Sequence, residues 1–349
     1  MTARREADRR ARRTMIAGGA IALLALAGSI LGGGEALAGW LGAAAAFSAV
    51  PAGSLVLLLM MRLIPGVWGE ELRLSVEAAT LLTGLAALLF APVLLASATL
   101  YPWARGAQLS GFQQAYLTPV FFALRTAGRF LLLLWIAARM RARRASVPTA
   151  AFGVVGIPLA AIAMSVDWFL SFDPKFVSSA FGLQFLLREI TLGFCAALVL
   201  RLAVAPAPRR VGIAGALLLT LLLLWAYIEF LSFFIGWSPN NPEAAAWYLR
   251  RGEGPWLVLL WGWAIASAVP LLLLLFARFR ASVRALICLA LLVAAGKLGE
   301  LAWIVLPGQG AVAPLVYGAA CLGLGLVLIG ALPFALRRRI ARRLPKGEG

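Results

Sequence analysis

The chain has 349 residues, of which 62% are hydrophobic, and its mean hydropathy is +0.92. A water-soluble globular protein is close to half apolar, so this composition excludes an ordinary soluble domain and indicates that lipid covers most of the surface. Histidine is absent. Its absence excludes bis-histidine haem, histidine-ligated zinc or copper, and hydrolytic sites of the Ser-His or Cys-His kind.

Ten apolar stretches follow one another along the chain, each close to the length of about 20 residues that a helix needs to cross a bilayer. At such lengths only helices satisfy their own backbone hydrogen bonds in hydrocarbon, so the sequence predicts an all-α membrane protein with about ten transmembrane helices. We expect one transmembrane domain over 15–336 between basic cytoplasmic tails at 1–14 and 337–349. The predicted spans are 15–33, 40–62, 75–99, 117–139, 149–170, 178–200, 212–236, 256–277, 285–306 and 312–336.

The segments between these spans alternate between arginine-rich and arginine-poor. Both tails and the segments after the second, fourth, sixth and eighth spans hold 24 of the 32 Lys and Arg residues. Positive segments stay in the cytoplasm, so both termini are predicted to be inside. The net charge of +18 therefore lies along one membrane face, where it suits anionic lipid headgroups rather than nucleic acid. The opposite side holds only Arg105, Lys175, Arg250 and Arg251.

No residue set for a cofactor is visible in the sequence. The three cysteines, Cys195, Cys288 and Cys321, are isolated in three different spans, which argues against an iron–sulfur cluster. We expect this chain to bind no metal and no cofactor of its own and to contain no catalytic residue. If the protein takes part in redox chemistry, its partners carry the metals.

The segments on the predicted outer side are rich in proline and aromatic residues. Stiff loops of this kind suit a periplasmic partner, but tryptophans at span ends are more often an interfacial aromatic belt. We favour the belt for Trp103, Trp237, Trp247 and Trp256.

Ionisable residues inside the predicted spans are the natural place to look for function. Such groups cost about 2.5–3.5 kcal/mol each on insertion scales, so we expect them to face one another or water rather than lipid. The cations are Arg125, Arg129, Arg188 and Lys297, and the carboxylates are Glu189, Glu229 and Glu300, with Asp167 near an outer span end and Glu77 near an inner one.

Helix spacing predicts several pairings. Lys297 and Glu300 are three residues apart and can pair within one helix. Arg188 and Glu189 are adjacent and point about 100° apart, so we do not expect them to pair with each other.

Arg125 and Arg129 are four residues apart and share one helix face, so they require carboxylates from other helices. Glu189 and Glu229 are the candidate partners, and we expect both to share an interior with Arg125. Burial favours the neutral form of a carboxylate and a nearby arginine favours the charged form, so one of these glutamates is suited to proton exchange. Ion pairs that only fix the packing, and a substrate site, are the other interpretations.

Four strings resemble the NrfD-like (polysulfide-reductase-type) membrane subunits, in particular the second such subunit of alternative complex III. The most specific is Asp-Trp-Phe-Leu-Ser-Phe-Asp-Pro at 167–174, which is followed by Ser178, Ser179, Phe181 and Gly182. The others are 115–125, 225–256 and 296–307. The chain departs from the family where Lys297 and Glu300 stand in place of Arg and Asp, and at 229–232, where the family usually has Phe-Ser-Gln.

The resemblance implies two four-helix bundles plus two peripheral helices. This agrees with a weak internal similarity, in which spans two to five and spans six to nine each form a block of four. It also implies a bacterial inner-membrane complex that oxidises quinol and passes electrons to cytochrome c or a haem-copper oxidase. The implied partners are a multihaem cytochrome, an iron–sulfur protein and a second NrfD-like subunit, and quinone or quinol is a contact at the surface of this chain. A stand-alone secondary transporter and a purely structural scaffold are the alternatives.

In this interpretation the buried charges line a proton pathway or a quinone-facing cavity. The residues concerned are Glu189, Glu229, Glu300, Arg125, Lys297 and Asp167. Asp167 is expected to have a structural role. At the end of its span its carboxylate can accept hydrogen bonds from backbone N–H groups of the turn at Asp173 and Pro174.

Overall fold

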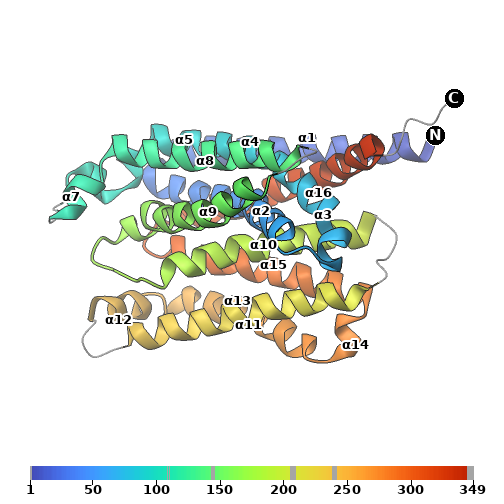
Figure 1. Cartoon of the computed structure of the whole chain (residues 1–349). Coiled ribbons are helices and arrows are strands. Elements are labelled where there is room, and N and C mark those ends of the chain that lie inside the picture. The colour runs from blue at the N-terminus through green and yellow to red at the C-terminus, as the bar shows by residue number, and fades with distance from the viewer. Residues whose placement is uncertain are drawn as a thin grey trace.

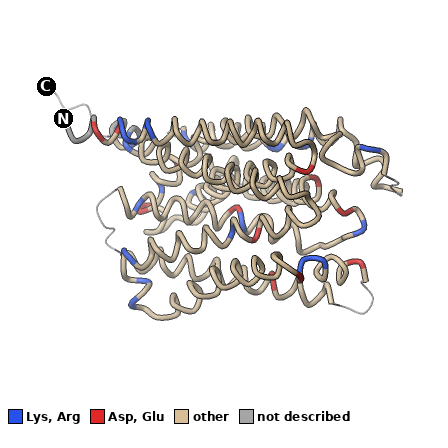
Figure 2. The backbone as a smooth tube through the Cα atoms, turned by 180° about the vertical axis from the view of Figure 1, so that it is seen from behind, with Lys and Arg blue, Asp and Glu red and all other residues tan. Residues whose placement is uncertain are grey.

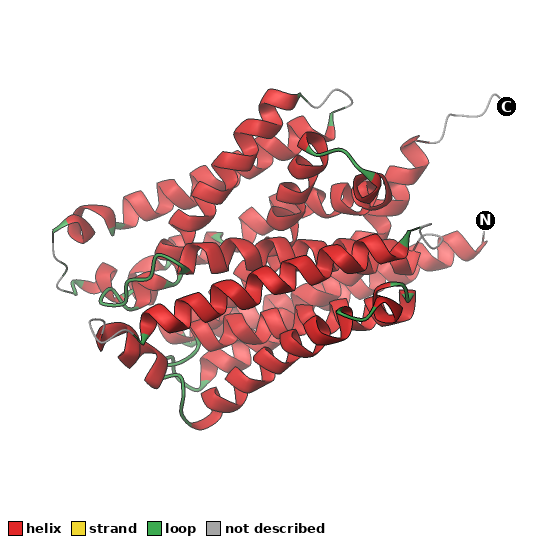
Figure 3. Cartoon of the chain, turned by 60° about the horizontal axis from the view of Figure 1, so that its bottom comes forward, coloured by secondary structure: helices red, strands yellow, loops and turns green. Residues whose placement is uncertain are grey.

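The computed structural model describes residues 2–107, 109, 111–142, 146–204, 210–237 and 242–343. Over these ranges the protein is 88% helical and contains no strand, and ten helices are long and apolar enough to cross a membrane. Figure 3 shows helices joined by short loops. The prediction of an all-α, multi-pass membrane protein is confirmed.

The spanning helices lie side by side, and the start of α1 and the end of α16 are at the same end of the molecule (Figure 1). The third span is broken into α3 (Val67–Ala79), η1 (Thr80–Leu82), α4 (Thr83–Leu89) and α5 (Ala91–Leu95). The other nine spans within the described ranges are α1 (Thr2–Leu31), α2 (Gly33–Leu63), α8 (Pro119–Arg141), α9 (Val147–Trp168), α10 (Phe181–Val204), α11 (Val211–Gly236), α13 (Gly254–Leu274), α15 (Val283–Val305) and α16 (Val312–Arg343).

Short helices connect these spans. At one end they are α6 (Ser97–Leu100), η2 (Pro102–Arg105), α7 (Phe112–Tyr116), η3 (Leu170–Phe172) and α12 (Pro242–Leu249), and at the other end α14 (Ala277–Arg280). Most coloured charges in Figure 2 lie near the two ends of the helices. A few blue and red segments lie along their middle, where the site described below is found.

Each predicted span coincides with one observed span, and the third is the one whose helix is interrupted. It begins at Val67 rather than at residue 75, and its helix narrows to a 3₁₀ turn after Ala79. There the Thr80 and Thr83 hydroxyls donate to the carbonyl oxygens of Glu77 and Thr80 at 2.8 and 2.9 Å. Side chains that bond back to the preceding turn compete with the helical ladder, which is a recognised cause of helix bending.

Helix α2 forms the centre of the molecule, because 94% of its most apolar 18-residue window is buried, against 72% for α10 and 50% for α15. It contacts α1, α3, α9, α10, α15 and α16. Its sequence explains this position, since residues 42–46 read Gly-Ala-Ala-Ala-Ala and small side chains let helices approach closely in a membrane.

The closest approach is the crossing of α2 and α10 at two glycines. A Cβ on Gly53 would lie 1.8 Å from the carbonyl oxygen of Glu189, and a Cβ on Gly193 would lie 2.4 Å from the backbone nitrogen of Ser54. The two backbones therefore touch directly. This crossing sets the position of α10, which carries several of the buried charges.

The division into two four-helix bundles stays a prediction. Helix α2 contacts α8 and α9, which belong to the first proposed group, and also α10 and α15, which belong to the second. Helices α1 and α16, which the prediction leaves outside both groups, pack closely against each other. A Cβ on Gly18 of α1 would lie 2.5 Å from the Gly323 carbonyl oxygen of α16.

The predicted aromatic belt is wrong for two of its four tryptophans. Trp103 and Trp247 are each only 5% exposed and therefore pack inside the protein. Trp103 stacks on Tyr101 with ring centroids 5.2 Å apart, and Trp247 stacks on Phe176 at 4.5 Å. These rings join the short connecting segments into one packed layer at that end of the molecule, whereas Trp237 remains 47% exposed, as a belt residue would.

Candidate functional site

Apart from Glu77 of α3, the charges predicted inside the spans lie on five helices, α8, α9, α10, α11 and α15, and most of them pair with a charge on another helix. The largest group is a triad in which one carboxylate serves two cations. Arg188 of α10 donates to Glu300 Oε1 of α15 from Nε at 2.9 Å and from Nη2 at 2.5 Å, and Lys297 Nζ donates to Glu300 Oε2 at 2.7 Å. None of the three residues is more than 3% exposed. The predicted Lys297–Glu300 pair is confirmed, and Arg188 is a partner that the sequence did not reveal.

Helix α11 closes this triad from the side. The Lys297 Nζ lies 3.9 Å from the centre of the Trp225 ring, a cation–π distance. Four residues further along α11, Glu229 accepts a hydrogen bond from Gln184 Nε2 of α10 at 2.9 Å. Gln184 lies one turn before Arg188, so Glu229 stands beside the triad. Its hydrogen-bond partner among the described residues is a neutral amide rather than a cation, which makes it chemically unlike Glu300.

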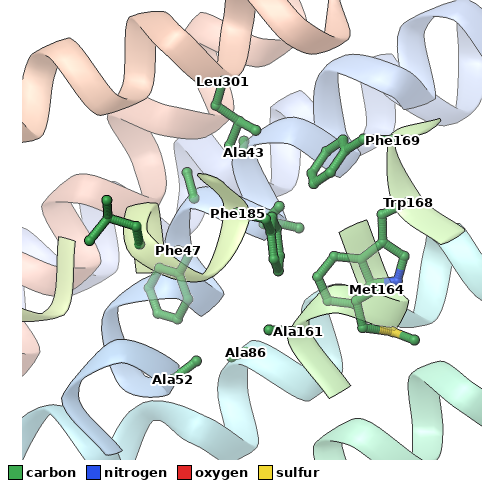
Figure 4. Packing of buried hydrophobic residues seen from close by; sticks show 14 of the residues in the cluster. Ala43, Phe47, Ala52, Ala86, Ala161, Met164, Trp168, Phe169, Phe185 and Leu301 are labelled. Atoms are coloured by element: carbon green, nitrogen blue, oxygen red, sulfur yellow. The ribbon is translucent and has the colours of Figure 1, made fainter. Parts of the chain in front are cut away.

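A second buried pair joins α8 to α10. Arg129 Nη2 donates to Glu189 Oε1, and the two residues are 2% and 1% exposed. The guanidinium lies 5.2 Å from the centre of the Trp168 ring and 5.5 Å from that of Phe185. Figure 4 shows both rings within the apolar packing. Among the described residues no hydrogen-bond partner is found for Arg129 Nε, Arg129 Nη1 or Glu189 Oε2, so the ion pair leaves three buried polar atoms unsatisfied there.

A third pair lies nearer the end of the helices. Arg125 binds Asp167 with two hydrogen bonds, from Nε at 2.7 Å and from Nη2 at 3.0 Å, and Nη2 also donates to the Tyr116 carbonyl oxygen at 3.0 Å. Asp167 is fully buried, whereas the Arg125 side chain is 21% exposed. The pair joins α8 to the C-terminal end of α9.

This third pair corrects two predictions. Arg125 does not bind Glu189 or Glu229, because Arg125 and Arg129 lie one turn apart and face different helices: the first reaches α9 and the second α10. The Asp167 carboxylate does not bind the Asp173 turn. Its oxygens are occupied by Arg125, and only its backbone carbonyl reaches forward, to Ser171 Oγ at 2.6 Å.

A contact between a connecting segment and α15 was missed entirely by the sequence analysis. Arg251 donates to the carbonyl oxygens of Trp247 and Ile304, each at 3.2 Å, and Trp303 Nε1 donates to the Arg251 carbonyl at 3.0 Å. Burial, and to a smaller extent the neighbouring Arg250, lower the pKa of Arg251 to about 9. One signal was available, since Arg250 and Arg251 are two of only four cations on the arginine-poor side.

The described residues bring no three His, Cys, Asp or Glu side chains together in a way that could hold a metal ion. A scan against protein-family models and a search of curated proteins each found no match. The fold and the site thus define a class, a polytopic helical membrane protein whose interior charges are paired across helices.

The Arg125–Asp167 pair carries a testable prediction about stability. Asp167→Asn is expected to keep much of the folded protein, because an amide oxygen can still accept from Arg125 and the arginine is partly exposed. Asp167→Leu is expected to lower stability by about 1.5–3 kcal/mol more, since it removes both carboxylate acceptors of Arg125 and leaves it the Tyr116 carbonyl oxygen. Retention of monodisperse protein after heating in detergent measures the difference. Equal tolerance of the two changes would show that the pair contributes nothing.

Proposed function

We propose that this chain is a cofactor-free membrane subunit of a quinol-oxidising respiratory complex of the alternative complex III kind, in a bacterial inner membrane. In this proposal it lines a proton pathway through its buried charges and anchors redox partners at the face formed by α7 and α12. The observation that carries it is the cluster of the buried Arg188, Lys297 and Glu300 with the half-buried Glu229.

The contacts within the resembling strings support this assignment. Arg125 belongs to the string at 115–125 and Asp167 to the string at 167–174, and the two residues bind each other. Arg251, from the string at 225–256, contacts Ile304 and Trp303 of the string at 296–307. Residues that carry the resemblance thus meet in space, as they would if they belonged to one inherited framework.

The chemistry of the cluster suits proton movement more than substrate binding. Glu300 is held by two cations, which keeps it charged and fixes its place. Glu229 stands at the edge of the same cluster with an amide partner, so a change in its protonation breaks no ion pair. Glu229 is therefore the group that we expect to exchange protons, beside a triad in which two cations share one carboxylate.

One observation favours a secondary transporter instead. Transporters bind their cargo at broken helices, and the third span is broken at Thr80–Leu82. The polar groups at this break are occupied by the protein itself: Arg141 Nη1 donates to the Thr80 carbonyl oxygen at 2.9 Å, and Glu77 pairs with Arg73 at 2.9 Å and with Arg339 at 3.1 Å. Hydrogen bonds and ion pairs from the protein's own side chains thus hold the break, which does not suit a cargo site.

Purification in gentle detergent tests the proposal. We expect the chain to copurify with c-type haem and an iron–sulfur subunit in fixed ratio, and the preparation to reduce cytochrome c with quinol. Dissociation of the subunits should leave the haem with the partner and none with this chain. A homogeneous preparation of this chain alone, from its native membrane and without quinol oxidation, would refute it and favour the transporter.

Topology gives an independent prediction. Reporter fusions after Arg210 and Arg280 should be cytoplasmic, and fusions within 102–112 should be periplasmic, because 24 of 32 cations lie on one side. Residues 108 and 110 of that range lie outside the described residues. Fusions after Arg144 and within 239–253 should be cytoplasmic and periplasmic respectively; Arg144 and residues 239–241 lie outside the described residues. Alkaline phosphatase and green fluorescent protein fusions provide the measurement. One reversed loop among the five would contradict the ten-span topology.

A further inference from the structure

A cavity of about 390 Å³ lies between α10, α15 and α16, with α2 as its floor. All of its lining side chains are apolar or thiols. Small-molecule sites typically measure about 300–1,000 Å³, and cavities without polar groups stay dry and take apolar ligands. An apolar molecule is therefore the ligand that this cavity suits.

The cavity opens toward lipid along one side. Its floor residues Ala43 and Phe47 are buried, whereas Leu291 on α15 and Ile329 on α16 are 53% and 65% exposed. On α16 its lining extends from Cys321 to Pro333, a rise of about 18 Å at 1.5 Å per residue. Half of a hydrocarbon core about 30 Å thick is close to this length. The groove thus runs through about one leaflet.

The shape of the cavity favours a flexible chain over a partner helix. A volume of about 390 Å³ spread over this length is a narrow space, whereas a helix with its side chains is about 10 Å wide. A single flexible hydrocarbon chain is narrow enough.

The two ends of the groove differ in charge, and this difference indicates the headgroup of the ligand. Arg284 lies seven residues before Leu291 on α15, so the two share a helix face about 10 Å apart. Its side chain is exposed and has no hydrogen bond or ion pair to any described residue. The other end of the groove is lined by Cys195, Leu298 and Cys321, and offers no charged group to a ligand. A ligand with an anionic head near Arg284 and an apolar tail pointing away from it matches both ends.

We propose that this groove binds one acyl chain of an anionic phospholipid, with the phosphate held by Arg284. The lipid fills the space that α2 leaves between α16 and the α10–α15 pair, and so completes the packing of α16. A quinone fits less well, because its headgroup is uncharged and gains less than an anionic head from the guanidinium at the mouth of the groove.

Native mass spectrometry of the delipidated protein tests this, with dioleoylphosphatidylglycerol and dioleoylphosphatidylcholine as probes. We expect one phosphatidylglycerol per chain, bound about fivefold more tightly than phosphatidylcholine, since a cation near an anionic headgroup contributes about 1 kcal/mol. Arg284→Gln should remove this preference. Ala294→Phe, which fills the groove, should weaken both lipids about tenfold or more by displacing buried methylenes.

Ala295→Phe is the matched control, because Ala295 is the next residue on α15 but is exposed and does not line the cavity. It should bind lipid like the unmodified protein, and circular dichroism and gel filtration should show that both variants are folded. The proposal is overturned if Ala294→Phe binds lipid unchanged, if Arg284→Gln keeps the full preference, or if ubiquinone at equal concentration displaces the phosphatidylglycerol.

Discussion

Gly53→Ala is expected to abolish the accumulation of folded protein. The new methyl group would lie 1.8 Å from the carbonyl oxygen of Glu189, a backbone atom that no rotamer change can move. Relief requires α2 and α10 to separate, and Gly193 on the other side of the same crossing already sits against the backbone of Ser54. The loss of stability should therefore exceed the value of about 1–3 kcal/mol that is typical of an overpacked core.

Gly128→Ala is the matched control for this prediction. Gly128 also lies inside a spanning helix, but it is exposed and a Cβ there would meet nothing within 4 Å. Alanine favours a helix over glycine by about 1 kcal/mol, so this change should be neutral or slightly stabilising. Gel filtration of fluorescently tagged protein measures both. Monodisperse Gly53→Ala protein at control levels would disprove the backbone contact between α2 and α10.

The fold was largely readable from the sequence, because each spanning helix satisfies its own backbone and needs only a long apolar stretch. The third span shows where this reading stops. Its break depends on Thr80 and Thr83 bonding to backbone carbonyls, and threonine bonds in this way only in some contexts. It was harder still to predict from the sequence which helices are neighbours. When protein and lipid are both apolar, no hydrophobic pattern distinguishes the side of a helix that faces protein from the side that faces lipid.

The site residues were predictable as a set, but their partners were not. A charge inside an apolar stretch is conspicuous, and spacing within one helix found Lys297 with Glu300. Pairs between helices depend on rotation and on which helices touch. Arg125 and Arg129 lie one turn apart on one helix, yet they bind Asp167 of α9 and Glu189 of α10. The tryptophans Trp103 and Trp247 were misplaced for the same reason, because residues at a span end can face protein or lipid.

The same substitution at two neighbouring glutamates should have opposite consequences. Glu300→Gln removes the one carboxylate that serves both Arg188 and Lys297, which are 3% and 0% exposed. Breaking a buried ion pair in this way costs about 3–5 kcal/mol, so we expect a large loss of thermal stability. Glu229→Gln keeps an oxygen acceptor for Gln184 and breaks no ion pair, so its stability should change by less than about 1 kcal/mol.

The loss of activity should not follow the loss of stability among the variants that still assemble. If Glu229 exchanges protons, Glu229→Gln should slow quinol oxidation or lower the protons released per electron in an otherwise intact complex, because an amide cannot take up and release a proton. Adding Lys297→Met to Glu300→Gln should restore part of the lost stability, since it removes one of the two unbalanced cations. A Glu229→Gln complex with unchanged turnover and unchanged proton release would mean that the cluster only holds helices α10, α11 and α15 together.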